Sequence, residues 1–193
     1  MIIDIHKGHA KIVKNNLVQF FDLGLLNDNT WLAGGALRSA LTGAEISDYD
    51  MFFRSLLDAA RVEVELESLG AETVFKCPQG KLTTMKYKGM KIQLITEFFY
   101  QDMNHLIDTF DITACRFATD GKVMFTKYSA IRDTYNKKIN LHRVDFPVAT
   151  MKRVAKYAAK GYKLTSKAAT FFVELVYNRG VDGKELDTRI YID

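Results

Sequence analysis

The chain has 193 residues, of which 48% are hydrophobic and 26% charged, and its formal net charge is +4. This is the composition of a packed domain, and it excludes disordered, collagen-like and disulfide-rich chains. No apolar run approaches the roughly 18 residues of a membrane span. The two cysteines, Cys77 and Cys115, lack the spacing of a zinc site. We therefore expect reduced core thiols in a cytoplasmic protein without an export signal or a membrane segment.

The apolar spacing predicts alternating helices and strands in the first half of the chain. Helices are expected at 8–26, 36–42 and 56–70, and short strands at 30–33 and 46–53. Further strands are expected at 73–76, 82–87 and 90–95, the last two joined by a tight turn at Lys88-Gly89. The segment 101–109 favours helix, 111–118 fits strand or helix, and Asp120-Gly121 is typical of a turn.

The character of the sequence changes after Pro147. One helix is expected up to Gly161, and another from Thr165 or Ser166 to the segment Asn178-Arg179-Gly180. The first has an apolar stripe of Met151, Val154, Ala155 and Ala158 beside a basic stripe of Lys152, Lys156 and Lys160. We therefore predict a mixed α/β body over residues 1–146 and a small basic helical segment over 147–193.

The charge is unevenly distributed along these two parts. Residues 1–150 hold 18 basic and 18 acidic side chains, whereas residues 151–193 hold nine basic and five acidic ones. The window 137–163 has eight Lys or Arg side chains against one acid, Asp145. Such a surface favours a polyanionic partner such as RNA, with Tyr157 and Tyr162 as candidates for base stacking, although a solvated helix face has the same composition.

One constellation indicates chemistry. Gly34-Gly35 lies between an expected strand and an expected helix, where free N–H groups and a partial positive charge favour phosphate. Arg38 follows in the first turn of that helix. Asp48 and Asp50 are two residues apart, so an extended strand places both carboxylates on one face. Paired carboxylates favour Mg²⁺, and a phosphate site beside the metal indicates attack on a nucleoside triphosphate.

The segment 32–53, Gly-Gly-x-x-Arg followed by Ser-Asp-x-Asp, resembles the signature of the nucleotidyltransferase superfamily that includes DNA polymerase β. It is most similar to the branch of the tRNA nucleotidyltransferases (CCA-adding) and the bacterial poly(A) polymerases. The segments 110–118 and 151–162 resemble later parts of that branch more faintly. The resemblance implies an α+β fold in which helices flank a nucleotidyltransferase-type mixed sheet, followed by a small helical neck.

The resemblance also implies roles for individual residues. Asp48 and Asp50 would hold the metal, with two Mg²⁺ ions expected, and Asp111 would complete the catalytic set. The nucleotide would be bound by Gly34, Gly35, Arg38, Ser47, Gln93, Arg153 and Lys156. The implied reaction transfers a nucleoside monophosphate from an NTP, ATP or CTP above all, to a hydroxyl, with release of pyrophosphate. The acceptor would be an RNA or tRNA 3′ end, a protein or a small molecule.

Departures from the family pattern leave two alternatives open. Gln93 stands where many members have a third carboxylate, and either Glu97 or Asp111 is a candidate to replace it. Phe110 stands where the family has arginine. One alternative is therefore a catalytically impaired protein that binds nucleotide or RNA as a regulator or inhibitor. The other is an unrelated α/β interaction protein in which the motif occurs by chance.

Overall fold

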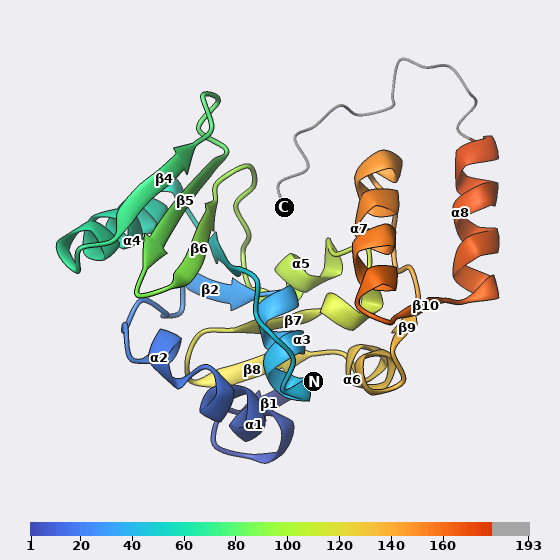
Figure 1. The fold of residues 1–193 in the computed structure, drawn as a ribbon, viewed down its shortest axis with the longest axis horizontal. Coiled ribbons are helices and arrows are strands. Elements are labelled where there is room, and N and C mark those ends of the chain that lie inside the picture. The colour runs from blue at the N-terminus through green and yellow to red at the C-terminus, as the bar shows by residue number, and fades with distance from the viewer. Residues whose placement is uncertain (179–193) are drawn as a thin grey trace. The chain divides into compact units, whose positions relative to one another are not determined.

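The computed structural model describes residues 1–178 (Figure 1). By packing, the chain divides into two compact units. The first unit comprises residues 1–107 and 115–127, and the second comprises residues 108–114 and the described residues from 128 onward. Residues 128–146 therefore pack with the C-terminal helices, although the sequence places them in the α/β body. A functional division at residue 146 stays a prediction.

The first unit is built on one mixed sheet of eight strands in the order β1-β8-β7-β2-β3-β6-β5-β4. Parallel pairing within it joins β3 to β6, and the other neighbours are antiparallel. The strands are β1 (Ile2–Asp4), β2 (Thr30–Ala33), β3 (Tyr49–Phe53), β4 (Glu72–Lys76), β5 (Leu82–Tyr87), β6 (Met90–Ile95), β7 (Phe117–Thr119) and β8 (Val123–Thr126). The predicted α+β fold with a large mixed sheet is confirmed.

Helices flank this sheet (Figure 1). They are α1 (Gly8–Asn16), α2 (Val18–Phe21), α3 (Gly35–Thr42), α4 (Leu56–Ser68) and α5 (Met103–Asp108), and a 3-10 turn, η1 (Thr113–Cys115), follows. The helix expected over 8–26 is interrupted at Leu17, whose ψ of 19° departs from helical geometry. Helix α3 ends at Gly43 as predicted, because Gly43 adopts the left-handed conformation at φ 67°.

The strands β3, β5 and β6 can be compared with the strands predicted from the sequence. The β5–β6 hairpin is confirmed with its predicted bounds, and Lys88 and Gly89 both have positive φ, as a two-residue hairpin turn requires. Strand β3 is shorter than the predicted 46–53, since it begins at Tyr49. Met51 and Phe53 are fully buried, as expected of the side of β3 that faces the core. Cys77 and Cys115 are buried free thiols, as expected.

The second unit is mainly helical. Its elements are α6 (Tyr128–Tyr135), β9 (Lys138–Ile139), α7 (Pro147–Ala159), β10 (Lys163–Leu164) and α8 (Ser166–Asn178), with β9 and β10 paired in parallel. Pro147 occupies the first turn of α7, where its missing N–H costs no hydrogen bond. Thr165 caps α8, because its hydroxyl oxygen accepts from the N–H of Ala168. Helix α8 begins at Ser166, within the predicted start, and is described up to Asn178, whereas the rest of the predicted stop, Arg179-Gly180, lies outside the described residues.

The apolar stripe of α7 is mostly exposed. Only Val154 of its four members is buried, and Met151, Ala155 and Ala158 are exposed. The buried face of α7 is instead formed by its first turn, where Pro147, Ala149 and Thr150 are buried.

None of the helices described up to residue 178 is both long and apolar enough to cross a bilayer.

Candidate functional site

The turn between β2 and α3 has the backbone geometry that the glycine pair predicts. Gly34 has φ 82° and ψ −131°, a backbone conformation that is strongly disfavoured for residues other than glycine. Its N–H donates to the carbonyl oxygen of Phe117 at 2.9 Å, which ties the turn to β7. No side chain caps the N-terminus of α3. The turn therefore presents the backbone N–H groups and positive dipole end of α3 to a ligand of negative charge.

Arg38 lies on α3 as predicted, but its side chain is directed inward. The residue is only 3% exposed, and its guanidinium donates to the Sγ of Cys115 and the Oγ of Ser39 at 3.8 and 3.0 Å. These contacts hold the guanidinium inside the first unit, where it connects α3 with η1. A direct contact between Arg38 and a triphosphate stays a prediction.

The two aspartates lie at the start of β3. Asp50 is the second residue of β3. Asp48 directly precedes the first residue of the strand, Tyr49, and lies in the loop that also contains the exposed Ser47. The ring of Tyr49, between them, stacks on Phe20 with ring centroids 4.9 Å apart. Because side chains alternate along a strand, Asp50 points to the sheet face opposite the Phe20–Tyr49 pair. Asp48 is nearly buried and Asp50 half-buried.

Asp50 belongs to a row of residues that crosses the sheet. It pairs in register with Ala33 on β2 and with Gln93 on β6, and Gln93 pairs in turn with Thr84 on β5. Residues in register share a sheet face, so Gln93 lies beside Asp50 on the same face. Ala33 is the residue directly before Gly34. The register therefore joins the glycine turn, an aspartate and the glutamine in one line of neighbours.

Gln93 has an unsatisfied amide. The residue is 3% exposed, and its Nε2 has no hydrogen-bond partner among the described residues. Leaving such a buried donor unpaired costs about 1–3 kcal/mol, so this group is a natural contact for a ligand oxygen. The position beside Asp50 is the one at which the sequence lacks a third carboxylate.

The residues present fit a Mg²⁺ ion that shares its coordination with substrate. Asp48 and Asp50 offer hard carboxylate oxygens, and Mg²⁺ binds through one or two carboxylates together with phosphates and water. Residues 1–178 contain no group of three or more His, Cys, Asp or Glu side chains that could hold a metal alone. The expected second ion stays a prediction.

The remaining predicted residues belong to the second unit. Asp111 accepts hydrogen bonds at Oδ2 from Thr150 Oγ1 and Arg153, at 2.8 and 2.7 Å, and at Oδ1 from the N–H of Ile112. Its side chain is 12% exposed, and that of Arg153 is 42% exposed. Lys156 is half-buried on α7, next to Tyr157, whose ring packs edge-on against Tyr162. The contact of Thr150 with Asp111 could not be predicted from the sequence, because a threonine within a helix does not indicate which distant residue it contacts.

Comparison with solved structures identifies the fold. The chain superposes on a CCA-adding enzyme in complex with CTP with a TM-score of 0.72 and 17% identity, covering 96% of this chain and 49% of that one. For the Thermotoga maritima CCA-adding enzyme complexed with tRNA, the TM-score is 0.68 at 16% identity, with coverages of 92% and 46%. The fold is thus that of the nucleotidyltransferases, and the chain spans about half the length of these enzymes.

Comparison of sequences identifies the family. The profile of the Gabija anti-defense 2 family matches residues 7–137. A protein of Bacillus phage SPbetaL7 named "Gabija anti-defense 2" is 31% identical over 138 residues, which are 69% of this chain and 34% of that protein. The chain thus spans about a third of this relative. By the extent of the match, the chain belongs to the Gabija anti-defense 2 family.

Proposed function

We propose that the chain is a Mg²⁺-dependent nucleotidyltransferase that transfers a nucleoside monophosphate from an NTP to a hydroxyl group and releases pyrophosphate. The observation that carries the proposal is the register of Asp50 with Ala33, the last residue before the Gly34-Gly35 turn. This pairing supports the proposal because the carboxylate that would bind the metal lies on the strand next to the helix terminus that would bind the phosphates. Either feature alone is common, whereas nucleotidyl transfer requires both at one place.

Each part of the site has a task in this reaction. The N–H groups of Gly35 and of the first turn of α3 would bind the phosphate oxygens, and Asp48 and Asp50 would hold the metal. Bound there, Mg²⁺ supplies charge neutralisation and lowers the pKa of the attacking hydroxyl. Gln93 Nε2 would donate to an oxygen of the bound nucleotide. A bond forms between the hydroxyl oxygen and the α-phosphorus as the bond to pyrophosphate breaks, and the hydroxyl proton passes to solvent water.

ATP or CTP is the proposed nucleotide, and an RNA or tRNA 3′ end is the favoured acceptor. Support comes from solved structures of similar fold, which are CCA-adding enzymes in complex with tRNA, CTP and ATP. In the second unit, Lys152, Lys156 and Lys160 lie at four-residue spacing along α7 and its C-cap, which suits contact with an RNA backbone. Arg153 and Lys156 stay candidates for the nucleotide.

The test is release of pyrophosphate from each of the four NTPs with Mg²⁺ and a mixed RNA acceptor. We expect release by the wild type and at least a 100-fold loss in Asp48→Asn/Asp50→Asn, the magnitude typical of losing electrostatic stabilisation. Asp22→Asn/Asp28→Asn is the matched control, because it removes the same charge from two exposed positions of the same unit. Equal release by wild type and the Asp48/Asp50 variant refutes the proposal.

A second candidate function is a nucleotide-binding inhibitor without turnover. The amide of Gln93 favours it, since an amide neither balances the charge of a second metal ion nor accepts a proton. The name of the family and of its phage relative, Gabija anti-defense, also fits an inhibitor. Equilibrium binding of NTP that depends on Asp48 and Asp50, without pyrophosphate release under any acceptor condition, would favour this candidate over the enzyme.

A further inference from the structure

Two lysines face each other on the small parallel sheet of the second unit. Lys138 on β9 and Lys163 on β10 are paired in register, and both side chains are exposed. Residues in register share a face, and like charges directly opposite each other destabilise a sheet. A third lysine, Lys137, precedes β9 with a positive φ of 48°. Its ammonium lies over Gly161, 3.8 Å from the place where a Cβ would stand. We call Lys137, Lys138 and Lys163 the β9–β10 lysine cluster.

Three acidic side chains of the second unit are paired with arginines. Arg132 pairs with Asp133 at 3.1 Å, Arg143 with Asp145 at 2.6 Å, and Arg153 with Asp111 at 2.7 Å. These pairs involve three of the five acidic side chains in the described part of this unit, the other two being Asp108 and Glu174. None of the three cluster lysines forms an ion pair with an acid in residues 1–178. The cluster therefore keeps its positive charge at the surface.

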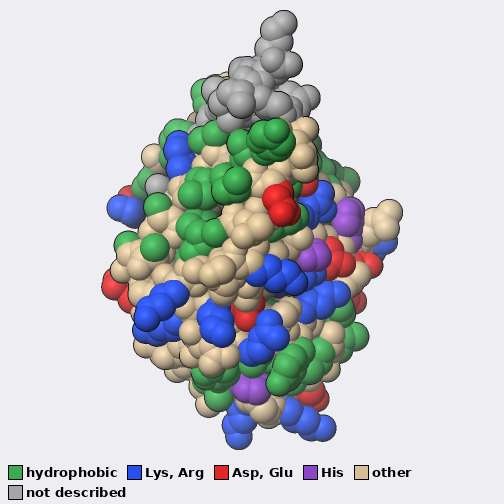
Figure 2. Space-filling model, turned by 90° about the vertical axis from the view of Figure 1, so that its right-hand side faces the viewer, with side chains coloured by type: hydrophobic (Ala, Val, Ile, Leu, Met, Phe, Trp, Pro, Cys, Tyr) green, Lys and Arg blue, Asp and Glu red, His purple; other side chains and the backbone are tan. Residues whose placement is uncertain are grey.

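The cluster belongs to a face of the molecule with many basic side chains. Figure 2 shows Lys and Arg side chains gathered over the middle and lower part of this face, with Asp and Glu side chains among and beside them. Lysine is depleted in protein–protein interfaces, where aromatic residues and arginine dominate. As a compact charge on a flexible stem, it suits sequence-independent contacts with phosphates. The composition of the cluster therefore favours a nucleic acid over an acidic protein.

We propose that the β9–β10 lysine cluster binds the phosphate backbone of RNA. The proposal does not require turnover at the aspartate pair, since it concerns other residues in the other unit. It also differs from an acceptor role for the basic stripe of α7, because the three lysines lie on or beside the parallel sheet. Bound phosphates relieve the repulsion between Lys138 and Lys163, so the cost of this pairing in the free protein is recovered on binding.

The test is fluorescence anisotropy with a labelled 20-nucleotide single-stranded RNA of mixed sequence, over a series of KCl concentrations. Each phosphate contact contributes about 0.7 to the slope of log K against log salt. We expect Lys137→Gln/Lys138→Gln/Lys163→Gln to lower the magnitude of this slope by about 2 and to weaken binding at least tenfold in low salt. Thermal unfolding should show no loss of stability, because the substitutions remove a repulsive pair.

The matched control is Lys7→Gln/Lys11→Gln/Lys86→Gln, which removes the same charge from three exposed positions of the first unit. It should leave the salt slope within experimental error of the wild type. Equal weakening in the two triple variants would reduce the effect to net charge and overturn the proposal. Displacement of the RNA by poly-glutamate at equal charge concentration would also overturn it, and would point to an acidic protein instead.

Discussion

Arg153 donates a hydrogen bond to Oδ2 of Asp111 at 2.7 Å, and the same oxygen accepts from Thr150 at 2.8 Å. Asp111 and Arg153 are 42 residues apart, and the sequence predicts a separate role in the nucleotide site for each. The structure shows that they also hold the segment 108–114 against the first turns of α7 within the second unit. A carboxylate with three donors is already well satisfied, which is typical of a positioning group.

We predict that Asp111→Ala destabilises the protein more than Asp111→Asn. The alanine variant removes all three acceptor contacts and leaves Thr150 and Arg153 without their partner, at a cost of about 1–2 kcal/mol after allowance for the exposure of Arg153. Urea unfolding followed by circular dichroism measures the loss. A double-mutant cycle with Arg153→Ala should give a coupling free energy near 1 kcal/mol, and a coupling of zero would contradict the anchoring role.

A second prediction concerns Gln93, whose amide nitrogen is buried without a partner. We expect Gln93→Leu to leave the free protein as stable as the wild type or more stable, because an unsatisfied buried donor is removed. The same variant should bind NTP about tenfold more weakly, as measured by equilibrium titration with Mg²⁺. An unchanged NTP affinity would show that Gln93 does not contact the nucleotide.

The variant Gln93→Asp places a further carboxylate beside Asp50. The melting temperature of this variant should therefore rise with Mg²⁺ more than that of the wild type.

The glycine turn and the opposite directions of Tyr49 and Asp50 could be predicted from the sequence, because both depend on neighbouring residues alone. Only glycine tolerates the φ of Gly34, and alternation along β3 separates Asp50 from Tyr49 whatever the rest of the chain does. The inward direction of Arg38 could not be predicted, since it depends on Cys115, a residue 77 positions away. Pairing of β9 with β10 was missed for a similar reason, because two-residue strands leave no periodicity to detect.

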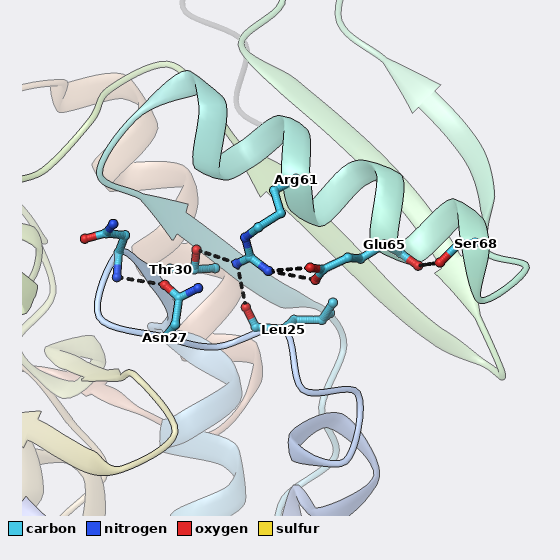
Figure 3. A network of polar contacts seen from close by, with 7 residues as sticks. Leu25, Asn27, Thr30, Arg61, Glu65 and Ser68 are labelled. Carbon is cyan, nitrogen blue, oxygen red and sulfur yellow. Dashed lines mark hydrogen bonds and ion pairs between the residues drawn. The ribbon is translucent and has the colours of Figure 1, made fainter.

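Arg61 anchors α4 beside the start of β2 (Figure 3). Its NH1 donates to both carboxylate oxygens of Glu65, at 2.7 and 2.8 Å, and its NH2 donates to Leu25 O and Thr30 Oγ1, both at 3.1 Å. Thr30 is fully buried and begins the strand that leads to the glycine turn. The contact with Glu65 alone is a surface pair of small value, whereas the contacts with Leu25 and Thr30 satisfy groups in the interior.

We therefore predict that Arg61→Ala lowers the free energy of unfolding by about 1–2 kcal/mol, because both interior acceptors lose their donor. Glu65→Ala serves as its control and should cost less than about 0.5 kcal/mol. Guanidinium unfolding of the two variants and the wild type measures the difference. Equal losses in both variants would mean that the ion pair carries the contribution of Arg61, and that the hydrogen bonds to Leu25 and Thr30 do not.

The last prediction concerns Tyr49, the residue between Asp48 and Asp50. Burial raises the pKa of the Tyr49 hydroxyl above its ordinary value of 10.0. The unfolded chain therefore loses this proton at a lower pH than the folded protein does. Stability is fully present below about pH 10 and falls as the pH rises toward the pKa of the folded state. Tyr49→Phe keeps the stack on Phe20 but has no proton to lose, so its free energy of unfolding should fall less steeply between about pH 9 and pH 11. Urea unfolding at several pH values compares the two slopes, and identical slopes would contradict the role assigned to burial of Tyr49.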